Sequence, residues 1–182
     1  MSRRSSPSAA SCTRPSVAAL DRRGVVSERR RAIVAVVGGS ECTATEAALA
    51  EELGRRLAQG GAVVVCGGLT GVMEAVARGV QAAGGLTIGI LPGNDARDAN
   101  RYIDVPLATG MGEMRNALIV RVAGAIVAIG GGSGTLSEIA LALRIGTPVV
   151  GLRDNFAGVT ELPRVADAAA AAAWALARAG SA

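Results

Sequence analysis

The chain has 182 residues, which is enough for one domain with a sizeable core and short for two. Half of the residues are hydrophobic but only 2% are aromatic, so we expect a core of Ala, Val, Ile and Leu, as in parallel sheets covered by helices. All 19 basic residues are Arg and His is absent. This composition excludes a Schiff base to Lys, a P-loop Lys, a His general base and a His metal ligand.

The net charge of +4 is concentrated near the N-terminus. Residues 1–31 contain eight Arg against Asp21 and Glu28, whereas the rest of the chain contains eleven Arg against thirteen acidic residues. We expect residues 1–31 to form a disordered Arg/Ser-rich tail, although their composition also fits an organelle transit peptide. Because the basic charge lies in this tail, we expect no nucleic-acid partner for the remainder of the chain.

The three Cys residues are scattered without metal-ligand spacing, so we expect no metal site and no disulfide framework. No stretch of eighteen uninterrupted apolar residues occurs, and we expect no membrane span. Together these features favour a cytoplasmic protein.

From residue 32 onwards, short apolar runs alternate with longer segments of helical periodicity. The predicted strands are residues 32–38, 62–68, 86–93, 125–131 and 147–152, with a short extended segment at 103–109. The predicted helices are residues 43–61, 70–85, 111–124, 134–146 and 161–180. This alternation predicts an α/β fold over 32–182, a single Rossmann-like domain with a doubly wound parallel sheet. Ligands of such folds bind beyond the carboxyl ends of the strands.

Three of the predicted strands end in loops of small residues: GGSE at 38–41, CGGLTG at 66–71 and GGGSGT at 130–135. Glycine permits close approach of a ligand to the backbone, and a helix that starts directly afterwards directs free N–H groups to the same place. The third glycine of a dinucleotide fingerprint would fall at Thr135, so that fingerprint is absent. A glycine loop can also be a simple tight turn, but three of them favour a phosphate pocket.

Glu138 has two interpretations. Thr135 and Glu138 have the spacing of a capping box, as do Thr43 and Glu46, where we expect no chemistry. Spacing alone therefore favours a helix cap at Glu138 over a catalytic carboxylate. Arg115, on the preceding predicted helix, would by the same reasoning lie on a solvated face.

The stretches CGGLTGVMEAVARGVQAAGGLTIGILPG and MGEMRNALIVRVAGAIVAIGGGSGTLSEIALAL resemble the LOG (Lonely Guy) proteins, which are often mislabelled lysine decarboxylases. Within that family the sequence is most similar to the molybdenum cofactor carrier branch. The resemblance covers roughly residues 32–152. LOG enzymes cleave the N-glycosidic bond of nucleoside 5′-monophosphates with an Arg and a Glu, and these match Arg115 and Glu138.

The resemblance also implies which residues bind the ligand. In the third glycine loop the residues that would hold a phosphate are Gly131, Gly132, Ser133, Gly134 and Thr135. Gly67, Gly68, Thr70 and Gly71 match a second loop of the family that lines the same pocket. The glycine pattern of the first loop adds Gly39 and Ser40 as expected ligand-binding residues. From the resemblance we expect that the chain requires no cofactor, that the molybdenum cofactor can be its bound ligand, and that it forms a homodimer or higher homo-oligomer as its relatives do.

The sequence departs from the LOG pattern at Asn116, where LOG enzymes have Lys, at Gly130, where they have Pro, and at Gly124, where they often have Asp. Two functions therefore stay open: a carrier or binding protein for a phosphorylated pterin or nucleotide, and a nucleoside 5′-monophosphate phosphoribohydrolase. A lysine decarboxylase is excluded, because a chain without Lys cannot form the internal aldimine. The methionines at 73, 111 and 114 fit either the core or the wall around the ligand's ring.

Overall fold

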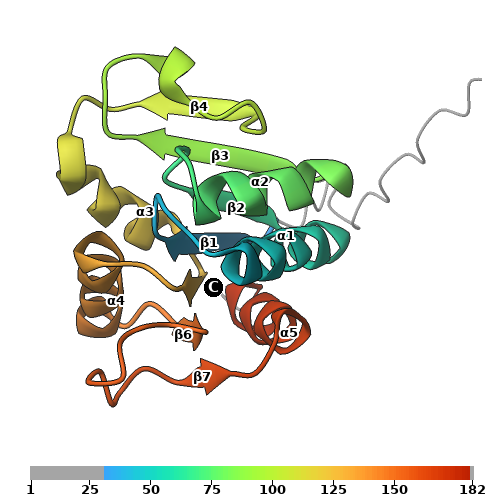
Figure 1. Ribbon diagram of the computed structural model, residues 1–182, viewed down its shortest axis with the longest axis vertical. Coiled ribbons are helices and arrows are strands. Elements are labelled where there is room, and N and C mark those ends of the chain that lie inside the picture. Colours follow the sequence, from blue (N-terminus) through green and yellow to red (C-terminus); the bar gives the residue numbers. More distant parts are fainter. Residues whose placement is uncertain (1–30, 181–182) are drawn as a thin grey trace, which may run out of the picture. The chain divides into compact units, whose positions relative to one another are not determined.

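Seven strands form one parallel sheet in the computed structural model, which describes residues 31–180 (Figure 1). The strands are β1 (Ile33–Gly38), β2 (Val63–Cys66), β3 (Leu86–Leu91), β4 (Val105–Ala108), β5 (Ala125–Ile129), β6 (Val149–Leu152) and β7 (Arg164–Val165). Their order is β4-β3-β2-β1-β5-β6-β7, and every neighbouring pair is parallel. The predicted Rossmann-like α/β fold is confirmed. The tail predicted for residues 1–31 lies, except for Arg31, outside the described residues.

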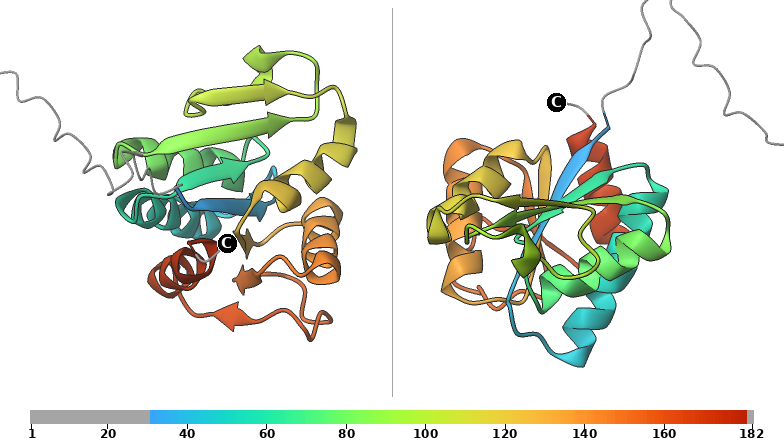
Figure 2. Two further views of the ribbon diagram at one scale, coloured as in Figure 1. Left: turned by 180° about the vertical axis from the view of Figure 1, so that it is seen from behind. Right: turned by 90° about the horizontal axis from the view of Figure 1, so that it is seen from above.

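The helices cover both faces of the sheet. They are α1 (Ala44–Gln59), α2 (Val72–Ala82), α3 (Asn116–Val122), α4 (Ser133–Ile145) and α5 (Ala168–Ala179), with short 3-10 helices η1 (Ala96–Asp98) and η2 (Gly112–Arg115). In the right-hand view of Figure 2, α3 and α4 lie on one side of the sheet and α1, α2 and α5 on the other. None of the helices within residues 31–180 is long and apolar enough to span a membrane.

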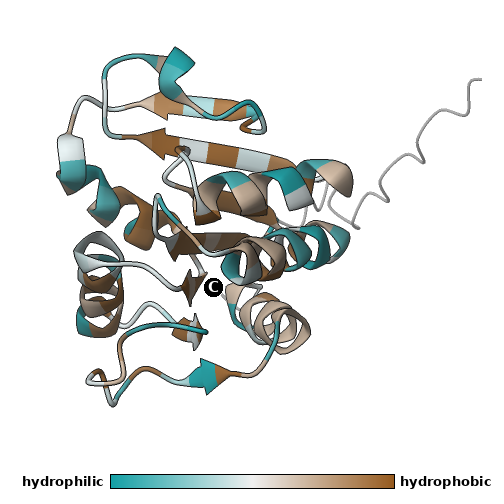
Figure 3. Ribbon diagram, viewed as in Figure 1, coloured by the Kyte–Doolittle hydropathy of each residue, from teal (hydrophilic) through white to brown (hydrophobic). Residues whose placement is uncertain are grey.

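The side chains of the central strands alternate between these two layers. On β1, Val34 and Val36 pack with α1, α2 and α5, whereas Ala35 and Val37 pack with α3 and α4. Figure 3 shows the central strands in brown and the outer sides of several helices in teal. A strand that is buried on both faces is apolar at every position, and this explains the continuous apolar runs of the sequence.

The strand order places the three glycine loops together. The chain adds β2, β3 and β4 on one side of β1 and then returns to add β5 on the other side. The carboxyl ends of β2, β1 and β5, where the loops begin, are therefore neighbours at one edge of the sheet. A reversal of strand order of this kind opens a crevice in which doubly wound proteins bind ligands.

The predicted helix 161–180 is wrong at its start. Arg164 and Val165 form β7, which extends the sheet beside β6. The helix α5 begins only at Ala168, where Asp167 accepts a hydrogen bond from the Ala170 N–H as its N-cap. The segment predicted as one helix at 111–124 is the 3-10 helix η2 followed by the short α3.

The helices α1 and α2 approach closely because each has a glycine at the crossing. A Cβ atom on Gly54 would lie against the carbonyl oxygen of Val76, and one on Gly79 against that of Glu51. This contact holds α2, and with it the β2 loop at its N-terminus, against α1.

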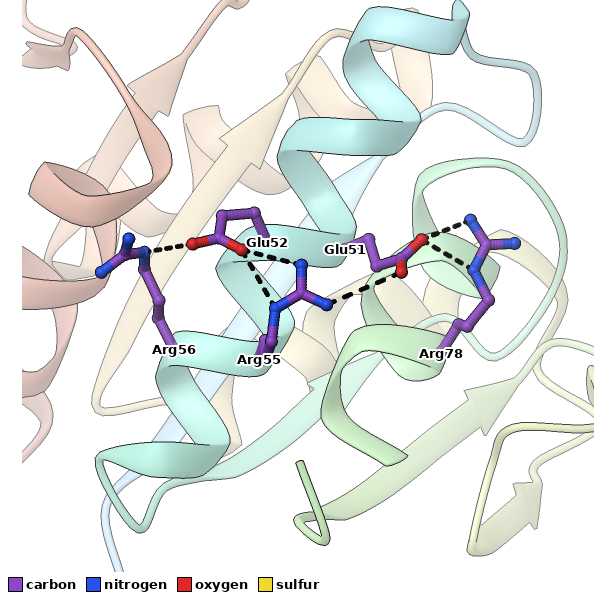
Figure 4. Close-up of polar contacts among 5 residues, drawn as sticks. All are labelled: Glu51, Glu52, Arg55, Arg56 and Arg78. Atoms are coloured by element: carbon purple, nitrogen blue, oxygen red, sulfur yellow. Dashed lines mark hydrogen bonds and ion pairs between the residues drawn. The ribbon is translucent and has the colours of Figure 1, made fainter. Parts of the chain in front are cut away.

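Ion pairs surround the crossing (Figure 4). Glu51 on α1 bonds Arg78 on α2 at 2.7 Å, and Glu52 bonds Arg55 and Arg56, each at 2.7 Å. These side chains are 30–45% exposed, so each pair contributes only about 0–1 kcal/mol. The glycine contact therefore determines the distance between the helices.

Replacing Gly54 by Ala tests this contact. Alanine normally stabilises a helix by about 1 kcal/mol relative to glycine. Here we expect Gly54→Ala to lower the free energy of unfolding by about 1–3 kcal/mol, because its methyl group would overlap α2. Urea denaturation measures the difference. Gly158→Ala is the control, since nothing lies within 4 Å of the Cβ position there. A Gly54→Ala protein as stable as this control would contradict the account.

Candidate functional site

A cavity of about 310 Å³ lies at the carboxyl ends of β1 and β5. Its lining residues come from β1, the first and third glycine loops, the β2 loop, α2, η2, α3 and α4. They are Val37, Gly38, Gly39, Ser40, Leu69, Met73, Glu113, Arg115, Asn116, Gly132, Ser133, Gly134, Thr135 and Glu138. The structure thus brings together Arg115, Glu138 and six of the eleven predicted ligand-binding residues.

The first turn of α4 forms one wall of this cavity. Gly132 is the N-cap residue and makes no side-chain cap, and Leu136 N–H already bonds Gly132 O at 2.9 Å. Within residues 31–180, the N–H groups of Ser133, Gly134 and Thr135 have no hydrogen-bond partner. Free N–H groups and the positive end of the helix dipole therefore face the cavity.

The capping box predicted from Thr135 and Glu138 is wrong. The helix starts at Ser133, so Thr135 is its third residue and Glu138 lies in its second turn, 5% exposed. The same spacing at Thr43 and Glu46 does form a capping box, at the start of α1.

In each of the two helices that follow the other glycine loops, one N–H group of the first turn is already bonded. At α1, Thr43 accepts from Glu46 N–H at 3.2 Å, and Glu46 accepts from Thr43 N–H at 2.8 Å. At α2, Val72 N–H donates to Gly39 O at 3.1 Å. Of the three helix starts next to the glycine loops, α4 is therefore the one in which all three N–H groups of the first turn lack a partner within residues 31–180 and belong to residues that line the cavity.

Arg115, at the end of η2, is buried rather than solvated, with 7% exposure. Its Nη1 donates to Asn116 Oδ1 at 2.6 Å, and its Nε is buried without a hydrogen-bond partner. Gly67 leaves room for the guanidinium group: a Cβ atom there would lie 2.6 Å from Arg115 Nη2 and 2.6 Å from Met73 Sδ. A buried cation with an unpaired donor favours an anionic ligand.

Glu138 lies 3.8 Å from Arg115, measured between Oε1 and Nη1. Burial raises the pKa of Glu138 to about 8, with Arg115 opposing and Glu113 adding to this effect. Glu138 is therefore largely protonated at neutral pH. The charge of Arg115 is then not neutralised by Glu138 and stays available to a ligand.

A chain of hydrogen bonds connects Arg115 to the first turn of α4. Asn116 accepts from Arg115 and its Nδ2 lies 3.4 Å from Ser137 Oγ, which donates to Gly134 O at 2.7 Å. Sequence reasoning noted Asn116 only as a departure from the LOG pattern and missed Glu113. Glu113 and Asn116 are three residues apart, on either side of Arg115, and this helical spacing is the signal that could have suggested both as site residues.

The residues predicted from the second glycine loop do not line the cavity. Gly67 lies beneath Arg115, and Gly68 packs against Gly89 of β3. Thr70 donates from Oγ1 to Ser40 O at 2.8 Å, and Gly71, with φ +67°, packs against Gly39 and Ser40. Thr70 and Gly71 therefore hold the first loop in position, while Leu69 reaches the cavity. Gly131 lies in an adjoining cavity.

Of the three methionines left open between core and ligand wall, Met73 is both buried and in the lining. Met111 and Met114 are 40% and 74% exposed and are absent from the lining. Cys66 is a buried residue of β2, and burial raises its thiol pKa to about 11, which leaves it unreactive.

The fold and the crevice at the reversal of strand order are those of a Rossmann-like ligand-binding protein. The model of the SLOG cluster4 family matches residues 31–175, and the chain belongs to this family. The resemblance to LOG proteins is thereby confirmed.

Two solved structures support the similarity of this chain to the molybdenum cofactor carrier branch of the family. The molybdenum cofactor binding protein from Rippkaea orientalis is 35% identical with a TM-score of 0.73, covering 77% of this chain and 92% of that one. The molybdenum cofactor carrier protein from Chlamydomonas reinhardtii is 34% identical with a TM-score of 0.72, covering 79% and 95%. A protein of Archaeoglobus fulgidus, described as uncharacterized, is 42% identical over 120 residues, 66% of this chain and 79% of that protein.

The buried carboxyl group predicts a pH-dependent effect of Glu138→Gln. The folded protein holds a proton on Glu138 up to about pH 8, whereas the unfolded chain releases it near the usual 4.5. Folding stability from this group therefore falls as pH rises between these values. Because Gln stays neutral, we expect the variant's melting temperature to exceed that of the wild type by an amount that grows from pH 5 to pH 8.

Thermal unfolding at several pH values measures this effect, with Glu161→Gln as an exposed control. A melting-temperature difference that is independent of pH would show that Glu138 is ionised in the folded protein.

Proposed function

We propose that this protein binds a phosphorylated heterocyclic ligand in the cavity and serves as its carrier. The observation that carries the proposal is the first turn of α4, whose N–H groups at Ser133, Gly134 and Thr135 are unpartnered beside the buried Arg115. A phosphate placed there would accept from these N–H groups and neutralise the guanidinium charge.

The rest of the cavity suits the ring of such a ligand. Leu69, Met73 and Val37 supply apolar surface to the cavity, and Asn116 and Glu138 supply polar groups. This mixture of apolar walls and a few polar groups is typical of small-molecule sites. Similarity to proteins that bind the molybdenum cofactor favours a phosphorylated pterin of that kind as the ligand.

A second candidate function is hydrolysis of a nucleoside 5′-monophosphate to the free base and ribose 5-phosphate. The specific observation that favours it is the position of Glu138, buried in the cavity wall beside Arg115 and not used as a helix cap. Its raised pKa would suit a general acid that protonates the leaving base while water attacks the sugar carbon.

Three further features stay predictions from the sequence: the homo-oligomer, the cytoplasmic location and the absence of a nucleic-acid partner.

Replacing Arg115, the buried positive charge of the site, tests ligand binding. We expect Arg115→Ala to weaken binding of AMP and of a pterin phosphate by about 10–100-fold, because a charge-assisted hydrogen bond to phosphate contributes about 1.5–3 kcal/mol. Isothermal titration calorimetry measures the affinity. Arg121→Ala, on the exposed side of α3, is the matched control. Equal affinities in the two variants would contradict the proposed phosphate site.

Release of free base separates the two functions. If the protein is a hydrolase, incubation with AMP yields adenine, and Glu138→Gln lowers the rate by at least about 100-fold while AMP still binds. If it is a carrier, AMP or the pterin phosphate binds and no base appears by liquid chromatography. Adenine release that survives in Glu138→Gln would contradict the catalytic role of that residue.

A further inference from the structure

A second cavity of about 280 Å³ adjoins the first one at the glycine loops. Both cavities are lined by Gly39, Ser40 and Gly132. The residues lining only the second cavity are Glu41, Glu46, Gly131 and Asn155. Gly132 is also the N-cap of α4, so the proposed phosphate position lies where the two cavities meet.

The two cavities extend towards different elements. Besides the shared loops, the first is formed by β1, the β2 loop, α2, η2, α3 and α4. The second is formed by the start of α1 and by the loop after β6, where Asn155 Nδ2 lies 3.5 Å from Gly131 O. A ligand with its ring in the first cavity would therefore reach the second one only through its phosphate.

The capping box of α1 fixes the side chain of Glu46 in the lining of the second cavity. Its Oε2 accepts from Thr43 N–H at 2.8 Å and from Thr43 Oγ1 at 2.9 Å. Its Oε1 makes no hydrogen bond within residues 31–180. Glu46 Oε1 is therefore a fixed carboxylate oxygen that can accept a hydrogen bond from a ligand.

The departure from the LOG pattern at Gly130 makes room for this carboxylate. Gly130 has φ +52°, a backbone conformation that proline cannot adopt. A Cβ atom at this position would lie against Glu46 Oε1. The proline of the LOG pattern is therefore incompatible with Glu46 in the place where this structure has it.

The chemistry of the second cavity differs from that of the first. Glu41 makes no side-chain hydrogen bond or ion pair within the described residues, and the lining includes no Arg to balance the two carboxylates. Carboxylates accept hydrogen bonds from hydroxyl and N–H groups and repel further phosphate charge. In dinucleotide-binding folds an acidic side chain binds ribose hydroxyls in this way.

We infer that the second cavity binds a hydroxyl-bearing group, such as a sugar, joined to the far side of the ligand's phosphate, with Glu41 and Glu46 as hydrogen-bond acceptors. The inference rests on the proposed phosphate site. It assigns the protein a phosphodiester or diphosphate ligand, in which the phosphate links two groups, rather than a terminal phosphate.

Three probes that share one adenosine phosphate test this inference: AMP, ADP and ADP-ribose. Their affinities are measured by calorimetry with EDTA present and again with Mg²⁺. The variants are Glu41→Gln and Glu46→Gln, alone and combined. Gln is chosen at position 46 because it also serves in a capping box, so α1 keeps its cap. Glu161→Gln is the exposed control.

We expect ADP-ribose to bind the wild-type protein at least about tenfold tighter than ADP in EDTA, the gain from one hydrogen bond to a charged group. The combined variant should lose this gain and bind ADP more tightly than the wild type does, while AMP affinity is unchanged.

Failure of the inference is distinguishable from failure of the proposed function. If AMP binds and ADP-ribose is no tighter than ADP, or its gain survives in the combined variant, the inference alone is wrong. If the gain requires Mg²⁺, the cavity is a cation site and the inference is again wrong. If none of the three probes binds, the proposed function is overturned and the inference with it.

Discussion

The free N–H groups in the first turn of α4 are the feature around which the site is built. They face the cavity because Gly130 and Gly131, both with positive φ, turn the chain sharply from β5 into the helix. The neighbouring loops are held by contacts of their own: Thr70 bonds Ser40, and Gly39 accepts from Val72. Because one N–H group in the first turn of α1 and one in that of α2 is already bonded, the largest set of free N–H groups at this sheet edge is that of α4.

The charges near α4 are unbalanced in a way that favours an anion. Arg115 is buried and partly unpaired, while burial keeps Glu138 protonated at neutral pH. A buried cation without a charged partner is costly to the fold, and a bound phosphate would remove that cost. Residues that serve function rather than folding commonly lower the stability of the protein in this way.

The fold was predictable because buried parallel strands and amphipathic helices leave clear periodic patterns. The β7 strand was missed, since a two-residue strand depends on its pairing with Leu152, although Pro163 and the N-cap residue Asp167 were local signals. Identical spacings at Thr43–Glu46 and Thr135–Glu138 have different outcomes because the turn at Gly130 and Gly131 moves the start of α4 upstream. The burial of Arg115 depends on Gly67 and Asn116 together, which only the folded chain brings into contact.

Amide chemical shifts measure the central claim most directly. In a ¹H–¹⁵N NMR titration with a pterin phosphate or AMP, the account predicts that the N–H signals of Ser133, Gly134 and Thr135 shift most. The capped start of α1, at Thr43 and Glu46, should change little. Shifts confined to other elements, with the amides of α4 unchanged at saturation, would contradict a phosphate site at this helix.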